Sequence, residues 1–151
     1  MAGVEWLLEI YGCPEKTLCN QETLTNLFRS IVSGMNLKPV GDSIWHRFPD
    51  TGGMTGFWLL QESHLAIHTF PEFQSACLNV FCCTERPALE WESILSEKLN
   101  AREIRVREYL RVYQKRKRTK TLSLAARAET AEEDRPKFQA PNSKSQIKSK
   151  F

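Results

Sequence analysis

The sequence predicts an α+β fold, a two-layer sandwich in which an antiparallel sheet carries two helices on one face. Three observations predict it. Apolar residues alternate with period two near both ends of residues 1–113, as in strands with one buried face. Two other segments carry apolar residues at helical spacing, and each forms one stripe that has to be buried. Short apolar segments with polar or Pro-containing breaks lie between those helices, which favours an antiparallel meander.

The first strand is expected at residues 4–10, where apolar side chains recur at every second position. A Gly-Cys-Pro turn follows it. Asn20 is suited to cap the first helix, because its side-chain oxygen can accept a hydrogen bond from a backbone N–H of the first turn. The apolar stripe of this helix is formed by Leu24, Leu27, Phe28, Ile31, Val32 and Met35.

The middle of the chain is expected to form the meander. Its segments are rich in apolar and β-favouring residues, and polar or Pro-containing breaks separate them. These strands are expected at residues 39–48, 57–60, 64–70 and 76–83, with a turn at 49–54.

The second helix is expected to begin at Pro87, since the first turn of a helix does not need the N–H that proline lacks. It is expected to end near Asn100, and the last strand to occupy residues 104–112. Large side chains such as Phe57 and Trp58 lie on the central strands. They predict that the sheet face away from the helices is partly covered, and a second copy of the chain could cover it.

Charge divides the chain near residue 113. Residues 1–113 hold 10 Lys/Arg and 14 Asp/Glu, whereas residues 114–151 hold 11 and 4 and few large apolar side chains. The second part cannot bury enough apolar surface to offset its ordering entropy. We therefore expect one folded domain, residues 1–113, and a basic disordered tail, residues 114–151. No aromatic residues interleave the basic run, which makes a solvated tail more favoured than a nucleic-acid or membrane-surface site.

The composition predicts a soluble protein of the cytoplasm. No apolar run approaches the length that spans a bilayer, and the first ten residues are acidic, unlike a secretory signal. The five cysteines are an odd number without such a signal, so we expect thiols and no disulfide framework. They are Cys13, Cys19, Cys77, Cys82 and Cys83.

The densest group of reactive side chains lies at residues 62–72 and contains two of the three histidines. On a strand, alternate side chains point the same way, roughly 6.6 Å apart. His64, His68, Phe70 and Glu72 are therefore expected to share one face. An acid, two imidazoles and an aromatic ring would line it.

Cys82 and Cys83 are expected on the following strand, beside this group. Together with His64 and His68 they offer nitrogen and sulfur ligands, but paired Cys-x-x-Cys spacing is absent. We therefore predict no metal site.

These residues are similar to those of the bacterial and archaeal adenosylmethionine decarboxylase family. The resemblance covers about residues 4–112, and the lengths between its motifs agree. It rests on Thr55-Gly56, on Glu62-Ser63-His64, on Ile67-His68-Thr69-Phe70-Pro71-Glu72, on Val80-Phe81-Cys82-Cys83, and on Glu9-Ile10-Tyr11-Gly12-Cys13 as the amino-terminal strand and turn.

The resemblance implies that the chain cuts itself between Glu62 and Ser63. In the family the serine hydroxyl attacks the preceding carbonyl, an ester replaces the amide, and elimination leaves dehydroalanine, which hydrolyses to a pyruvoyl group. This is the implied cofactor, derived from Ser63. A ketone condensed with the substrate amine accepts the electron pair that decarboxylation leaves, which no ordinary side chain can do. His68 corresponds to the histidine that removes the Cα proton, and Thr55 to an assisting hydroxyl.

The resemblance also implies residues that act on the substrate. Cys83 corresponds to the group that returns a proton to the substrate carbon, while Phe70, Glu72 and His64 are expected near the substrate. Strand alternation puts Cys82 and Cys83 on opposite faces, so only one can point at the site, and spacing favours Cys83.

The implied function is decarboxylation of adenosylmethionine by a homodimer, which supplies aminopropyl groups for polyamine (spermidine) synthesis. An arginine or ornithine decarboxylase on the same scaffold stays open, because the motif does not report the side-chain pocket. A non-catalytic paralogue that regulates an active partner also stays open. It is favoured by Asn79 and Cys82, which stand where the family usually has Asp and Thr.

Overall fold

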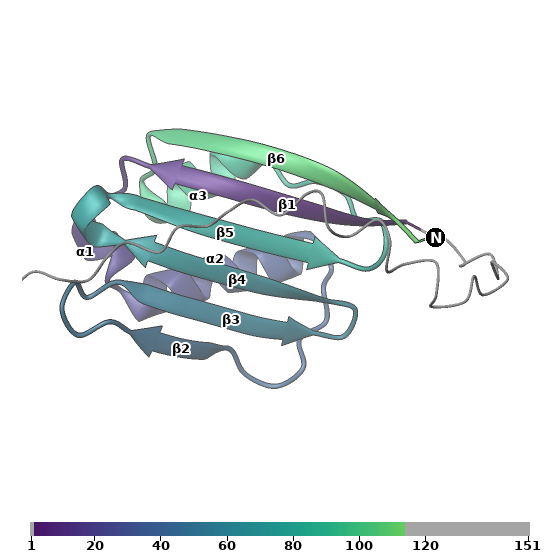
Figure 1. The fold of residues 1–151 in the computed structure, drawn as a ribbon, viewed down its shortest axis with the longest axis horizontal. Helices are drawn as coiled ribbons and strands as arrows, with labels where there is room; N and C mark the ends of the chain where they lie inside the picture. The colour runs from purple at the N-terminus through teal and green to yellow at the C-terminus, as the bar shows by residue number, and fades with distance from the viewer. Residues whose placement is uncertain (1, 114–151) are drawn as a thin grey trace, which may run out of the picture. The chain divides into compact units, whose positions relative to one another are not determined.

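Six strands form one antiparallel sheet in the order β2-β3-β4-β5-β1-β6 (Figure 1). This computed structural model describes residues 2–113, so the predicted tail, residues 114–151, lies outside the described residues. The strands are β1 Ala2–Tyr11, β2 Ile44–Arg47, β3 Met54–Leu60, β4 Ser63–Phe70, β5 Ser75–Cys82 and β6 Glu103–Val112. The helices are α1 Glu15–Leu18, α2 Gln21–Gly34 and α3 Trp91–Leu99, with a 3-10 turn, η1, at Pro71–Phe73.

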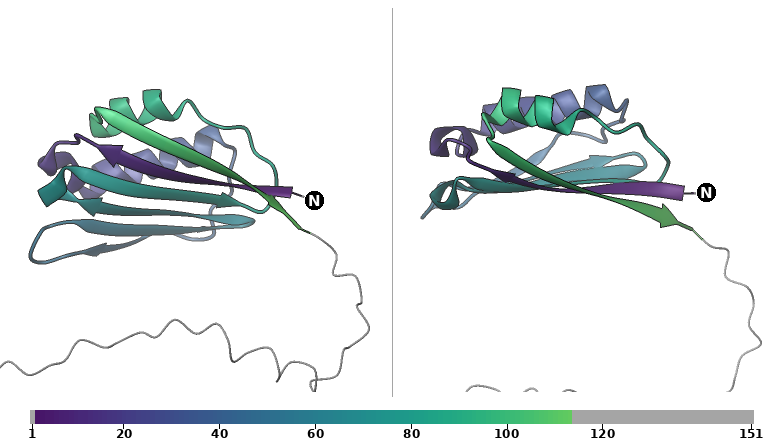
Figure 2. Two further views of the ribbon diagram at one scale, coloured as in Figure 1. Left: turned by 45° about the horizontal axis from the view of Figure 1, so that its top comes forward. Right: turned by 90° about the horizontal axis from the view of Figure 1, so that it is seen from above.

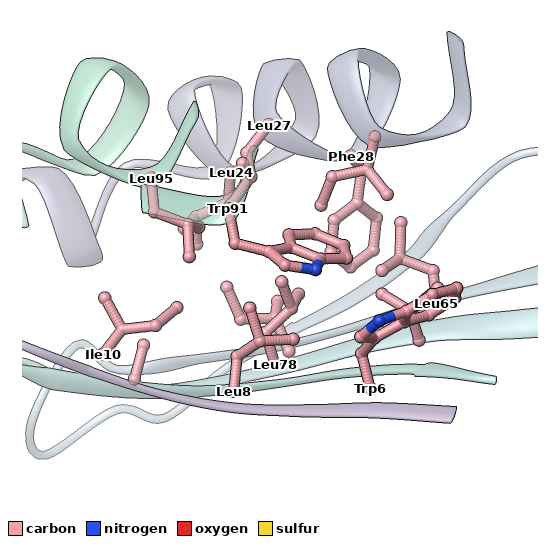
Figure 3. Close-up of a cluster of buried hydrophobic side chains, with 14 of the residues drawn as sticks. Trp6, Leu8, Ile10, Leu24, Leu27, Phe28, Leu65, Leu78, Trp91 and Leu95 are labelled. Carbon is pink, nitrogen blue, oxygen red and sulfur yellow. The ribbon is translucent and has the colours of Figure 1, made fainter. Parts of the chain in front are cut away.

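The helices lie on one face of the sheet, which confirms the predicted two-layer α+β sandwich (Figure 2). The alternation seen in the sequence is the cause. On β1 the side chains at positions 4, 6, 8 and 10 are buried and meet the apolar stripes of α2 and α3 (Figure 3). Burial of each large apolar side chain stabilises the fold by about 1.5–3 kcal/mol. This core includes Trp6, Leu8, Ile10, Leu24, Phe28, Trp91 and Leu95.

Local residue types predict some helix ends correctly and one wrongly. Asn20 caps α2 as predicted, because its side chain accepts a hydrogen bond from the N–H of Thr23 at 3.0 Å. Asn100 ends α3 in the left-handed conformation, at φ 53°. The predicted start at Pro87 is wrong, since α3 begins at Trp91. Residues 87–90 instead form the non-helical connection that brings the chain from the sheet to the helix layer.

The edge of the sheet departs from prediction. Of residues 39–48, only Ile44–Arg47 form a strand, and Pro39 makes an isolated bridge to Leu60. Proline has no N–H to donate and Gly41 has a φ of 71°, so a continuous ladder does not form there. Trp58 was predicted on the face away from the helices, but it stacks on Phe28 of α2, with ring centroids 6.4 Å apart.

The opposite face of the sheet carries polar and aromatic side chains, and we call it the open face. Within residues 2–113 no helix covers it. Strand register pairs Arg107 and Arg111 of β6 with Leu7 and Gly3 of β1, so Glu9 and Glu5 are their diagonal neighbours on this face. Arg107 lies 3.5 Å from Glu9, and Arg111 binds Glu5. Phe57, Leu59 and Phe70 are exposed on the same face. Cover by a second copy stays a prediction.

Candidate active site

The bond between Glu62 and Ser63 lies at a tight turn. Gln61 and Glu62 connect β3 to β4, and Leu60 pairs with Ser63 across the hairpin. The carbonyl oxygen of Glu62 accepts a hydrogen bond from the backbone N–H of Cys83 at 2.8 Å. The N–H of Gln61 donates to the carbonyl of Lys38 at 2.8 Å. The carbonyl next to Ser63 is therefore held in place and polarised by a backbone donor.

The side chain of Glu62 is also held by the segment that follows β5. Arg86 Nη2 lies 3.0 Å from Glu62 Oε2, and the Thr84 hydroxyl donates to the same oxygen at 3.1 Å. Thr84 and Arg86 could not be recognised as site residues from the sequence, since they lie in a loop without periodicity and reach Glu62 only through the fold.

Ser63 lies beside Cys82. The two residues are direct partners across β4 and β5, on the side of the sheet that meets the helices. Burial raises the pKa of the Cys82 thiol, and the hydrogen bond with Ser63 offsets this only in part, so the thiol stays protonated at neutral pH. Cys82 is 1% exposed, whereas Cys83, just after β5, is half-buried. The two thiols thus differ in access as well as in position.

Thr55 and His68 meet on the open face. They oppose each other across β3 and β4, and Thr55 Oγ1 lies 2.9 Å from His68 Nδ1 in a hydrogen bond. When the ring donates through Nδ1, its Nε2 keeps a lone pair and can act as a base. Two of the predicted processing residues are therefore brought together.

Ser63 and His68, in contrast, are not brought together within one chain. They lie five positions apart on β4, a separation of roughly 16 Å at the rise of a strand. Odd positions of β4 face the helices and even positions face the open side, so the two side chains point to opposite faces. His68 therefore cannot reach Ser63 of its own chain.

His64 is clamped between two aromatic rings. Phe57 and Phe81 stack on either side of the imidazole, with centroids 5.7 and 5.6 Å away and both planes tilted by 22°. His64 Nε2 lies 2.8 Å from Asn79 Oδ1. The ring is therefore fixed in position and in its hydrogen-bond partner.

Asn79 links His64 to an acid on the neighbouring strand. Its Nδ2 donates to Glu5 Oε1 at 3.1 Å and to the carbonyl of Trp6 at 3.3 Å. Both partners only accept, so the amide oxygen must face His64, whose Nε2 carries the hydrogen. Burial would raise the pKa of Glu5, but hydrogen bonds from Arg111 and Asn79 and the Arg111 charge outweigh it and hold that pKa below its ordinary value.

Phe70 and Glu72 separate at the end of β4. Phe70 is exposed on the open face, in line with His64 and His68. Glu72 lies in η1, because Pro71 ends the strand and opens a 3-10 turn. The prediction that Glu72 continues the strand face is therefore wrong.

A hollow of about 370 Å³ lies on the open face. His68 lines it, together with Glu9, Cys77 and Arg107. Burial and the neighbouring Glu9 charge raise the pKa of the Cys77 thiol. The hollow combines a cation, an acid and the histidine that hydrogen-bonds Thr55.

The five cysteines are free thiols, in agreement with the sequence prediction. Burial raises the pKa of Cys13 to about 11, so that thiol is an inert packing group. In the described part of the chain, no three His, Cys, Asp or Glu side chains are grouped so as to hold a metal ion. No helix within the described residues is both long and apolar enough to cross a membrane.

Comparison with known proteins gives a consistent result. A family model described as S-adenosylmethionine decarboxylase matches residues 4–112. The S-adenosylmethionine decarboxylase proenzyme of Clostridium tetani is 36% identical over 113 residues, covering 72% of this chain and 86% of the relative. That of Archaeoglobus fulgidus is 31% identical over 90 residues, covering 60% and 79%. The crystal structure of the adenosylmethionine decarboxylase of Aquifex aeolicus has a TM-score of 0.63 and 25% identity, covering 78% of this chain and 96% of that one.

Proposed function

The chain belongs to the S-adenosylmethionine decarboxylase family, and from that membership we propose that it cuts itself between Glu62 and Ser63 and decarboxylates S-adenosylmethionine. One observation carries the proposal: the Glu62 carbonyl, directly before Ser63, is held by the Cys83 N–H at 2.8 Å. The relatives from Clostridium tetani and Archaeoglobus fulgidus are named proenzymes, which supports a cut. The product supplies aminopropyl groups for spermidine synthesis.

The cut begins at the held carbonyl. The Ser63 hydroxyl attacks the Glu62 carbonyl carbon, and negative charge develops on the oxygen that the Cys83 N–H already contacts. One such preorganised donor contributes about 2.7–4 kcal/mol to a barrier of this kind. His68, oriented by Thr55, is proposed to remove the Cα proton of residue 63, so that the ester is eliminated.

We propose that the cofactor is a pyruvoyl group made from Ser63. The residues fit this group, since a hydroxyl side chain follows a polarised peptide carbonyl at a tight turn. Such a ketone, condensed with the substrate amine, takes up the electron pair left when carbon dioxide departs. Cys83 is proposed to return the proton to the substrate carbon. Cys83 is favoured over Cys82 because Cys82 is 1% exposed, whereas Cys83 is half-buried.

We further propose that the active form is a homodimer and that the catalytic set is shared between its two copies. The roughly 16 Å between Ser63 and His68, on opposite faces of one strand, supports this. The exposed Phe57, Leu59 and Phe70 on the open face give a second copy an apolar surface to bury. The partner's His68 and the partner's Thr55 then serve the Glu62–Ser63 bond, and Phe70, Glu72 and His64 remain proposed substrate contacts.

Experiments distinguish three possible functions, which are decarboxylation of S-adenosylmethionine, decarboxylation of arginine or ornithine, and regulation by a non-catalytic paralogue. Denaturing mass spectrometry of the purified protein is expected to show two fragments that add up to nearly 17.4 kDa. A single uncut chain would favour the regulatory paralogue. Release of carbon dioxide from carboxyl-labelled S-adenosylmethionine, but not from arginine or ornithine, is expected from the names of the relatives. Ser63→Ala is expected to stay intact and inactive, and a cut or active variant would refute the assignment.

The remaining expectations complete the proposal. We propose that residues 1–113 are the decarboxylase domain and that residues 114–151 are a basic extension outside it. We also propose that the protein lies in the cytoplasm and acts on a small-molecule substrate. An assay of the chain with and without residues 114–151 tests whether the extension contributes to activity.

A further inference from the structure

Arg86 brings an unused hydrogen-bond donor to a small cavity beside the proposed cut. The cavity has a volume of about 30 Å³ and is lined by Leu37, Lys38, Gln61, Glu62, Ser63 and Arg86. Arg86 Nη2 binds the Glu62 side chain at 3.0 Å. Arg86 Nε is buried and has no hydrogen-bond partner among residues 2–113. A buried donor on a charged group is unfavourable unless an acceptor satisfies it.

The cut creates an acceptor at this place. This step rests on the proposed function. When Ser63 Oγ bonds to the Glu62 carbonyl carbon, the peptide C–N bond breaks and an ester forms. Elimination then removes the Cα proton of residue 63 and breaks the Cβ–Oγ bond, so Oγ stays with Glu62 as the second oxygen of a new α-carboxylate. The dehydroalanine left behind takes up one water and releases ammonia to become the ketone.

Both oxygens of that carboxylate begin at known positions. The first is the Glu62 carbonyl oxygen, which already accepts from the Cys83 N–H at 2.8 Å. The second is the former Ser63 Oγ, and Ser63 lines the same cavity as Arg86 and Lys38. An arginine fork can bind one carboxylate through Nη2 and another through Nε, because its donors are fixed in a plane.

We propose that Arg86, together with Lys38, is the receiving site for the α-carboxylate of Glu62 that self-cleavage generates. Arg86 is thus a positioning residue. Before the cut its only side-chain partner within residues 2–113 is Glu62, in a half-exposed pair of the kind that contributes little to stability. After the cut it also binds the new α-carboxylate of Glu62. This keeps the turn in place and keeps that negative charge away from the carbonyl of the proposed pyruvoyl group.

The Nε–H of Arg86 reports the new hydrogen bond directly, without an activity assay. Its exchange with water is measured by NMR in the uncut Ser63→Ala chain and in the mature wild-type protein, with Arg86→Lys used to identify the signal. Exchange is expected to be about tenfold slower, or more, in the mature protein, because the acceptor is charged. Arg105 Nε, which donates to Glu103 at 2.9 Å on β6, is the internal control and is expected to exchange equally in both.

Two different results would overturn the proposal, and they are distinguishable. If the wild-type chain is cut but Arg86 Nε–H exchanges at the same rate as in Ser63→Ala, the carboxylate is bound elsewhere and only this site is refuted. If the wild-type chain keeps a single mass of 17.4 kDa, no carboxylate has formed, and the proposed function falls with it.

Discussion

Mixing two inactive variants tests whether the cut is made by residues of two copies. Ser63→Ala removes the attacking hydroxyl, and His68→Ala removes the base. On β4 these residues lie roughly 16 Å apart with side chains on opposite faces, whereas proton transfer requires heavy atoms about 3 Å apart. A strand of eight residues fixed between β3 and β5 cannot bend to close that gap. Each variant alone lacks one of the two groups in every copy, so each is expected to stay at full mass.

The mixture is expected to recover part of the cut. In a dimer with one copy of each variant, the Ser63 of the His68→Ala chain faces an intact His68 from its partner. If the two chains are expressed equally and pair at random in a symmetric dimer, about half of the His68→Ala chains have such a partner. About half of them are expected to be cut, and none of the Ser63→Ala chains.

The assay is denaturing mass spectrometry of the co-expressed chains, with carboxyl-terminal tags of different mass to tell them apart. His46→Ala is the matched control, since it removes the third histidine, which lies on β2 against Phe48, and this variant is expected to cut on its own. A mixture with no more cut than the two variants show separately would refute the shared site. Normal cutting by His68→Ala alone would refute the role of His68.

Three further predictions concern the thiols, the acid on β1 and a close contact in the sheet. Cys83→Ala is expected to cut itself but to release carbon dioxide at least about tenfold more slowly than wild type, since general-acid groups contribute about 10²–10⁴-fold. Cys82→Ala is expected to retain most activity, and the opposite pattern in the same assay would identify Cys82 as the proton donor. Glu5 has a pKa below its ordinary value, so its pairing with Arg111 and Asn79 stabilises the fold fully above that ordinary pKa and is lost as the pH falls through the lower folded value. The Ser63→Ala protein is therefore expected to lose stability below about pH 4.5 in thermal unfolding. Adding Glu5→Gln is expected to lower its stability at pH 7 and to reduce this acid dependence, and an unchanged acid dependence would count against the pairing. Gly56→Ala is expected to destabilise the fold by about 1–3 kcal/mol in urea unfolding, because a methyl group there would overlap the indole of Trp45. Gly41→Ser is the control, since Gly41 has open space around it but a φ of 71°, so this variant measures backbone strain without overlap. Equal losses of stability in the two variants would contradict the overlap.

Local patterns determined most of the elements. The period-two runs at residues 4–10 and 104–112 became β1 and β6, and the helical stripe after Asn20 became α2. On β1 and α2 the apolar face is buried, whereas on β6 Ile104 packs against the core but Val106, Leu110 and Val112 are exposed. The residues around Ser63 also indicated the family from the sequence alone, since they join the Glu62-Ser63 pair, a histidine and a cysteine at fixed spacing.

Some boundaries depended on contacts that local patterns do not contain. Pro87 satisfies the rule for a first helical residue, yet the chain needs residues 87–90 to pass from the sheet to the helix layer before α3 begins. Trp58 is as apolar as Phe57, but only the register with β4 decides which of the two meets Phe28 of α2.

The sequence by itself therefore determined the strands, the main helices and the set of reactive residues. Tertiary structure decided which of those residues meet. It separated Ser63 from His68 by strand length and by face, set Cys82 beside Ser63, and brought Arg86 from a loop to Glu62. The physical reason is that periodicity records how each segment buries its own apolar face, whereas a contact between distant segments depends on strand order and register, which are set by packing of the whole sheet.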